Sequence, residues 1–250
     1  MLEIFLAKNF TYLRSAGLQP NRHAHIAPQI SIAARPHLLA SSELSGEGLY
    51  FAGEESHSVT SDGIMHTFLV NPVIPKARLL SRVGPASLSF RVPDCLAEQL
   101  ENSVLRPSEQ ATLNDLLDLI LNHLLRGAGE PEPLDQRIAE ALEYIDDLEQ
   151  KRIAAGELAE QLALSESRFL HLFKAELQTT VRKYLLWLRT GDGVRMVVEG
   201  ASITEAAHAT GFTDSAHFAR VFKQMFGLTL SAAVAGEPRP KLVVENRKGP

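Results

Sequence analysis

The chain has 250 residues, 45% of them hydrophobic, and a formal net charge of −5 at pH 7, which suggests two domains with a core each. Its single cysteine, Cys95, excludes an intrachain disulfide framework and fits a reducing cytosol. It shows neither a long uninterrupted apolar run nor a basic start before an apolar segment, so we expect a cytoplasmic protein without a membrane partner. The negative charge counts against nucleic-acid binding, which usually shows a basic footprint.

Residues 1–93 carry short apolar or alternating runs instead of a helical period. Gly, Pro, Ser and Asn separate these runs, as in short antiparallel strands. A sandwich or a small barrel would bury them. The runs are LEIFLA, QISIA, HLLAS, GLYFAG, HTFLVN, ARLLSRV and LSFRV.

Four histidines lie in this region: His23, His25, His57 and His66. The spacing from Gly17 through His23 and His25 to Gln29 resembles the first metal motif of cupins, except that the motif has Glu where Gln29 stands. The stretch from Gly46 to His57 resembles the second motif, with Ala52 for Pro and Glu54 for Gly. Three imidazoles could hold zinc or a similar ion, but Gln offers only a neutral oxygen. We favour histidines that line a strand surface or a pocket, and expect no metal and no cofactor.

From Asp94 the period becomes helical. Residues 94–104 and 109–126 predict two helices, with Ser108 as N-cap of the second and Gly127 at its end. The second helix has a wide apolar stripe, which packs on its own sheet or pairs with a second copy across a two-fold axis. The stripe is Leu113, Leu116, Leu117, Ile120, Leu121, Leu124 and Leu125. Residues 127–133 are rich in Gly and Pro, as in an interdomain linker.

After an amphipathic helix over 134–150, ended by Lys151 and Arg152, the segment Ile203–Ser231 predicts helix, turn and helix. Gly211 suits the turn and Asp214 the N-cap of the second helix. Apolar residues at 218, 221, 222 and 225 form one face of that helix, which we expect to be buried. Its outward face carries Ala216, Arg220 and Lys223.

The segment Leu158–Lys174 repeats this pattern. The offset is 48 residues at the first helix and 49 at the second, so one copy has a turn that is one residue longer. Ser165 is the N-cap, and Ser167, His171 and Lys174 face outward. Charge is sorted locally: residues 165–189 hold five cations and two acids, although residues 134–149 are acidic.

The repeat resembles the DNA-binding domain of AraC/XylS-type transcription regulators over about residues 135–235. The matching residues of the second copy are Gly211, Phe212, Phe218, Arg220, Phe222, Lys223 and Gly227. Departures are Gln178 for a Gly, Ala216 for a Ser, Leu230 for a Pro, and Thr190 and Gly193 in the helix that connects the copies. With Gly191, Gly193 puts the stiffness of that helix in doubt, at about 1 kcal/mol each relative to Ala.

The resemblance implies a two-domain α+β protein. A cupin-like antiparallel β-barrel with two helices, residues 1–126, would sense a small-molecule effector. A linker, 127–133, would join it to an all-α double helix-turn-helix domain, 134–236, followed by a loose tail, 237–250. The Leu-rich helix resembles the dimer contact of the family, which predicts a homodimer, and RNA polymerase is a further implied partner.

We therefore expect a sequence-specific regulator of transcription that is not an enzyme and that places two helices in successive major-groove segments of a bipartite operator. The expected DNA-contacting residues are Ser167, Arg168, His171, Lys174, Arg182, Ser215, Ala216, Arg220 and Lys223. The expected effector-binding residues are His23, His25 and His57. An ion pair to Glu205 or Asp214 is an alternative role for Arg220. The rival functions are a cupin-type metal-dependent enzyme and a protein-binding adaptor that has lost DNA contact.

Overall fold

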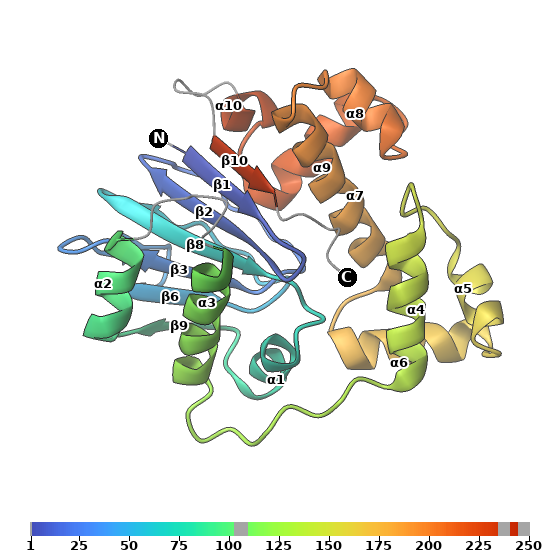
Figure 1. Cartoon of the computed structure of the whole chain (residues 1–250), viewed down its shortest axis with the longest axis horizontal. Helices are drawn as coiled ribbons and strands as arrows, with labels where there is room; N and C mark the ends of the chain where they lie inside the picture. The colour runs from blue at the N-terminus through green and yellow to red at the C-terminus, as the bar shows by residue number, and fades with distance from the viewer. Residues whose placement is uncertain (1, 103–109, 235–240, 245–250) are drawn as a thin grey trace. The chain divides into compact units, whose positions relative to one another are not determined.

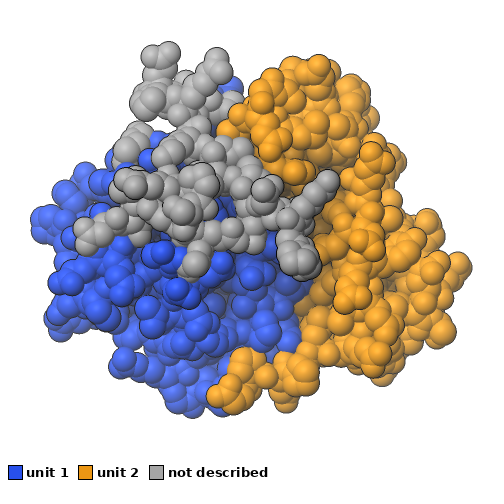
Figure 2. Space-filling model, viewed as in Figure 1, with its two compact units in different colours: residues 1–129, 222–250 blue, residues 130–221 orange. Residues whose placement is uncertain are grey.

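The computed structural model describes residues 2–102, 110–234 and 241–244 (Figure 1). The chain forms two compact units, which are coloured separately in Figure 2. Unit 1 comprises residues 1–129 and 222–250, and unit 2 comprises residues 130–221. No helix within the described ranges is long and apolar enough to cross a membrane.

A seven-stranded sheet is the centre of unit 1 (Figure 1). Its strand order is β10-β1-β2-β8-β3-β6-β9, antiparallel throughout except for the parallel pair of β1 and β10. The strands are β1 (Leu2–Leu6), β2 (Phe10–Ala16), β3 (Gln29–Ala33), β6 (Gly48–Phe51), β8 (Ile64–Val70), β9 (Ser87–Phe90) and β10 (Lys241–Val244).

The predicted barrel is wrong, because this sheet is open. Strands β10 and β9 form its two edges and are not paired with each other in the described part of the chain. Other elements cover both faces, so the apolar side chains of the sheet are buried without closure into a barrel. On one face lies a small sheet of β4 (Leu39–Ala40), β5 (Ser45–Gly46) and β7 (Thr60–Ser61). Leu39 of that sheet packs with Leu49, Phe51 and Met65 of the large one.

Three helices cover the other face: α1 (Pro75–Val83), α2 (Asp94–Asn102) and α3 (Gln110–Leu124) (Figure 1). The run ARLLSRV, predicted as a strand, is part of α1. Pro75 lies in the first turn, where a helix does not need its missing N–H. Ala77 and Leu80, three residues apart, are buried against the sheet. Strand β2 (FTYLRSA) is not among the strands predicted from the sequence.

The apolar stripe of α3 is buried within its own unit. Leu113, Leu116, Leu117, Ile120 and Leu121 are each at most 4% exposed and belong to the same core as the sheet, while Leu124 and Leu125 are partly buried against it. The stripe on which the homodimer prediction rested is therefore accounted for inside one chain. The predicted N-cap, Ser108, lies outside the described residues.

The tail expected to be loose contains a strand. Residues Lys241–Val244 form β10, which pairs in parallel with β1, Glu3 opposite Lys241 and Leu6 opposite Val244. The outer edge of β1 would otherwise leave its N–H and C=O groups without ladder partners. A Leu-Val-Val sequence has a high strand propensity, which explains why this segment pairs there.

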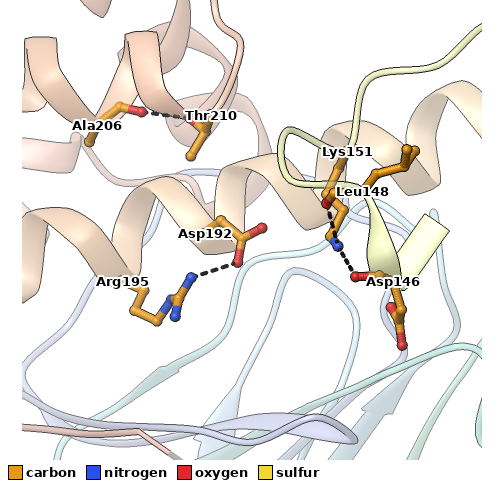
Figure 3. A network of polar contacts seen from close by, with 7 residues as sticks. All are labelled: Asp146, Leu148, Lys151, Asp192, Arg195, Ala206 and Thr210. Atoms are coloured by element: carbon orange, nitrogen blue, oxygen red, sulfur yellow. Dashed lines mark hydrogen bonds and ion pairs between the residues drawn. The ribbon is translucent and has the colours of Figure 1, made fainter. Parts of the chain in front are cut away.

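Unit 2 is all helical, with two short–long helix pairs around a long connecting helix. Its helices are α4 (Gln136–Asp147), α5 (Ala155–Gln161), α6 (Glu166–Leu177), α7 (Val181–Val198) and α8 (Ile203–Ala209). Helix α9 (Ser215–Phe226) crosses into the residues of unit 1, which include α10 (Leu230–Val234). Buried Lys151 donates from Nζ to the carbonyl oxygens of Asp146 and Leu148 at the end of α4 (Figure 3), as a cation at a helix C-terminus should.

The two glycines of α7 do not interrupt it. Gly191 is exposed, with open space around its Cα, whereas Gly193 is buried. A Cβ on Gly193 would lie 2.7 Å from the ring of Phe218. Gly193 therefore lets Phe218 of α9 approach the backbone of α7, which explains why the chain departs from the family pattern at this position.

Candidate DNA-binding face and histidine cluster

The turns of the two helix-turn-helix repeats have the same hydrogen bonds, 48 residues apart. Leu164 N–H donates to Ala159 O at 2.9 Å in the first repeat, and Phe212 N–H donates to Ala207 O at 2.9 Å in the second. The residue before each donor is left-handed: Ala163 has φ 52°, and Gly211 has φ 77°. Gly211 supplies the turn as predicted, and Ala163 takes the same conformation with a side chain.

The extra residue in the second turn is Thr213. In the first repeat, Leu164 is followed directly by the N-cap Ser165, whose side chain accepts from Arg168 N–H. In the second, Thr213 comes between Phe212 and Asp214, and Asp214 Oδ1 accepts from His217 N–H at 2.7 Å. Both predicted N-caps are present, and the change of offset from 48 to 49 residues lies at this point.

The predicted outward residues of both repeats lie on the solvent side of their helices. In α6, Phe169 and Phe173 are fully buried, while Ser167, Arg168, His171 and Lys174 are exposed. In α9, Phe218, Val221 and Phe222 are buried, while Ala216, Arg220 and Lys223 are exposed and Ser215 is half-buried. Arg182, at the start of α7, is also exposed.

Arg220 makes no ion pair or hydrogen bond with another described residue, Glu205 and Asp214 included. Glu205 instead accepts from the backbone N–H of Ser202, in a capping box that begins α8, and Asp214 caps α9. Both acids proposed as intramolecular partners are thus engaged with backbone. The exposed guanidinium of Arg220 can therefore contact a ligand outside the chain.

Arg189 of α7 is a positioning residue whose role the sequence did not reveal. Its guanidinium donates to Gly211 O at 3.2 Å and lies 5.3 Å from the ring centre of Phe212. Burial, followed by the charges of Arg152 and Arg182, lowers the pKa of Arg189. Arg189 therefore ties the second turn to the connecting helix, and only its match to the family pattern could have indicated this role.

Three of the four N-terminal histidines form one cluster. His23, His25 and His57 are 8%, 4% and 2% exposed, and their ligating nitrogens lie within 4.8 Å of one another. The backbones of His23 and His57 pair through two hydrogen bonds of 2.9 Å. Gly53 lets their two loops meet, because a Cβ there would lie 2.3 Å from Ile26 O. His66 is separate and bonds to Tyr12 Oη at 2.7 Å.

Burial changes the protonation of this cluster. It lowers the pKa of His25 to about 3 and that of His57 to about 4, with further lowering from neighbouring histidines, and it lowers the pKa of His23. All three imidazoles are therefore neutral at pH 7. Glu54, which stands where the cupin motif has Gly, adopts the left-handed φ of 68° that glycine would favour.

The rings of the cluster are closely packed. Its rings pack on one another with centroids 4.6 to 5.5 Å apart, and Phe51 stacks on His57 at 4.5 Å. Unit 1 also has a shallow hollow of about 290 Å³, lined by Leu38, Gly46, Glu47, Ser89, Phe90 and Arg91. The histidines predicted to bind an effector thus lie together, but away from that hollow.

Known proteins that are similar to this chain match it in the region of the helix-turn-helix repeat. A family model described as a helix-turn-helix domain matches residues 158–235. The arabinose operon regulatory protein of Escherichia coli K12 is 33% identical over 139 residues, 52% of this chain and 46% of that protein. The probable transcriptional regulator LumQ of Photobacterium leiognathi is 27% identical over 135 residues, 54% and 53% of the two chains. The chain spans about half the length of these curated relatives.

Most of the chain also shares its fold with a solved structure. The crystal structure of unsaturated fatty acid bound ToxT from Vibrio cholerae strain SCE256 superposes with a TM-score of 0.57 at 12% identity, covering 90% of this chain and 95% of that one. An N-terminal sheet region and a C-terminal helix-turn-helix region are thus shared. The comparisons confirm the predicted resemblance to AraC-type regulators, which covers the helix-turn-helix region.

Proposed function

We propose that this chain is a sequence-specific DNA-binding regulator of transcription. The observation that carries the proposal is the repeated helix-turn-helix, with buried aromatics on one side of each second helix and exposed polar or cationic side chains on the other. Two such helices fit successive major-groove segments of one operator. The named relatives are transcriptional regulators, which supports a regulator more than an enzyme.

The residues divide by the contact they can make. Lys174, Lys223 and Arg182 would meet phosphates and set the register without reading sequence. Arg220 would fork onto a guanine, and Ala216 would contact a thymine methyl. Ser167 and His171 would read the other half of the site, with Arg168 and Ser215 beside them.

An effector bound in unit 1, at His23, His25 and His57, completes the proposal. The unsaturated fatty acid bound to ToxT supports a ligand-responsive regulator with this fold, and the 12% identity leaves the ligand of this chain to experiment. Homodimerisation and contact with RNA polymerase are further parts of the proposal. Sedimentation at micromolar concentration tests the dimer, which a purely monomeric species would exclude.

Selection of bound fragments from random duplex DNA tests the proposal directly. We expect enrichment of a bipartite motif whose halves lie about one helical turn apart. Binding should weaken as salt rises, because Lys and Arg release counterions from phosphates. Retention of DNA without an enriched motif would leave only non-specific binding, and no retention at 50 mM salt would favour the adaptor.

A further inference from the structure

The nitrogen atoms of the histidine cluster are already sorted by role. In each imidazole, Nδ1 lies against a backbone carbonyl oxygen: that of Asn21 at 2.9 Å for His23, of Ala27 at 2.7 Å for His25, and of Glu55 at 2.8 Å for His57. Because a carbonyl only accepts, Nδ1 carries the proton in a neutral ring. The other nitrogen, Nε2, is then the acceptor nitrogen of each ring.

A fourth acceptor meets these nitrogens. Gln29 Oε1 lies 3.2 Å from Nε2 of His25 and 3.0 Å from Nε2 of His57. The amide is oriented by a chain of hydrogen bonds along the sheet: its nitrogen donates to Ser31 Oγ at 3.0 Å, which bonds to Thr67 Oγ1 at 3.0 Å. Ser31 and Thr67 are cross-strand partners of β3 and β8, so the strand register fixes this chain.

Acceptors that face one another in a buried site need a positive charge between them. Imidazoles that donate Nδ1–H to a carbonyl and point Nε2 at a common centre are the arrangement by which proteins orient metal-bound histidines.

We propose that His23, His25 and His57 bind one divalent transition-metal ion through Nε2, with Gln29 Oε1 beside it as a weak fourth ligand. Nitrogen-rich sets of this kind suit zinc and its neighbours in the first transition row, and not Ca²⁺ or Mg²⁺. Tetrahedral zinc holds its nitrogens roughly 3.4 Å apart, so rings now within 4.8 Å close slightly around the ion. The metal-free site favoured from the sequence is replaced by this assignment.

The cluster also touches the end of α9. Residues 222–250 belong to the same compact unit as the cluster. Asn21 N–H donates to Gly227 O at 2.9 Å, and the rings of His25 and Phe226 lie 6.3 Å apart. The same Asn21 presents its carbonyl to His23 Nδ1. Closure of the histidines around an ion would therefore move the loop that holds the last turn of α9, so the metal is the effector of the proposed regulator.

This last step rests on the proposed function, whereas metal binding does not, so binding is measured first and without DNA. The purified full chain is stripped with a chelator, dialysed, and titrated with Co²⁺ and then Zn²⁺. We expect visible absorption that saturates at one Co²⁺ per chain, is lost when Zn²⁺ displaces it, and is accompanied by a rise in melting temperature. No saturable uptake by the folded chain would overturn the proposal.

Variants assign the ion to the cluster. His25→Gln and His57→Gln should each weaken affinity by about tenfold or more, because each removes a ligand. His37→Gln is the matched control, since His37 is outside the cluster and bonds to Asp62; its affinity should be unchanged. Equal affinities in all three variants would refute the site, and circular dichroism establishes that each is folded.

Gln29 supplies a test that does not remove a histidine. Gln29→Glu replaces a neutral amide with an anionic ligand and should tighten binding by about tenfold. In the rival arrangement the amide is flipped and its NH₂ group donates to both Nε2 atoms, without a metal. That arrangement predicts no Co²⁺ uptake by the unmodified chain. DNA binding that does not change with Zn²⁺, in a chain that does bind Zn²⁺, would overturn only the effector role.

Discussion

The two helix-turn-helix repeats have the same local geometry but are fixed by different residues. The first makes its left-handed turn with Ala163 and ends α6 with Gln178 at φ 56°, whereas the second uses Gly211 and Gly227 at the corresponding places. Phe173 of the first packs edge-on against Tyr184 of α7, at 5.8 Å. The hydrogen-bond pattern is thus preserved, while the residues that stabilise it and the side chains that face outward have diverged.

This comparison shows which positions shape the fold and which are available for recognition. Phe169 and Phe218 are both fully buried, 49 residues apart, as are Ala159 and Ala207, 48 residues apart. At the exposed positions His171 corresponds to Arg220. The two repeats are therefore alike at these buried positions and differ at this exposed one.

The largest expected effect separates the two glycines of α7. Gly193→Ala should lower the free energy of unfolding by up to about 3 kcal/mol, because the new methyl group overlaps the Phe218 ring. Gly191→Ala is the matched control and should raise it by about 1 kcal/mol through helix propensity. Urea unfolding of both variants measures the difference. Equal changes would mean that the second repeat does not need this close contact.

The next effect concerns base reading. Arg220→Ala should cost about 1–3 kcal/mol of discrimination between the selected site and random DNA. His171→Ala should cost less, since an imidazole lacks the forked donors with which a guanidinium contacts guanine in a bidentate way. Titration of both DNAs with each variant measures the ratio. Arg126→Ala removes the same charge from an exposed position outside both repeats. If Arg126→Ala lowers the discrimination as much as Arg220→Ala does, the effect of Arg220 comes from its charge alone and not from base reading.

The smallest effect exchanges the turn residues. Gly211→Ala should lower the free energy of unfolding by about 1 kcal/mol, because a side chain at φ 77° is strained although the nearest atom would be 3.7 Å away. Ala163→Gly should raise it by about 0.5 kcal/mol, the relief of strain less the added chain entropy. Thermal unfolding followed by circular dichroism can resolve both. The same sign for both substitutions would show that the turns are not equivalent.

Local signals made unit 2 predictable. Caps, turn glycines and apolar stripes act within a few residues, so both repeats and the residue inserted in the second could be read from the sequence. The function of Gly193 could not, because it depends on Phe218, which lies 25 residues further along the chain. In unit 1 the strands were largely predictable, but the openness of the sheet was not, since it depends on the helices and the small sheet that cover it.

The candidate sites differ in the same way. The outward residues of α6 and α9 follow from helical spacing and are exposed as expected, except for the half-buried Ser215. The spacing of the histidines indicated a cluster but not the orientation of its rings. That orientation is set by the carbonyl oxygens of Asn21, Ala27 and Glu55, which the path of the loops brings into place.

The pairing of β10 with β1 joins segments that are far apart in the chain, residues 3–6 and 241–244. While the chain is on the ribosome, strand β1 must wait for residues 241–244 before its outer edge is covered. Until then unit 1 presents an open edge that can recruit a strand from a neighbouring chain. Proteolysis or truncation beyond the second helix-turn-helix would therefore affect the N-terminal sheet, far away in sequence, by exposing that edge to self-association.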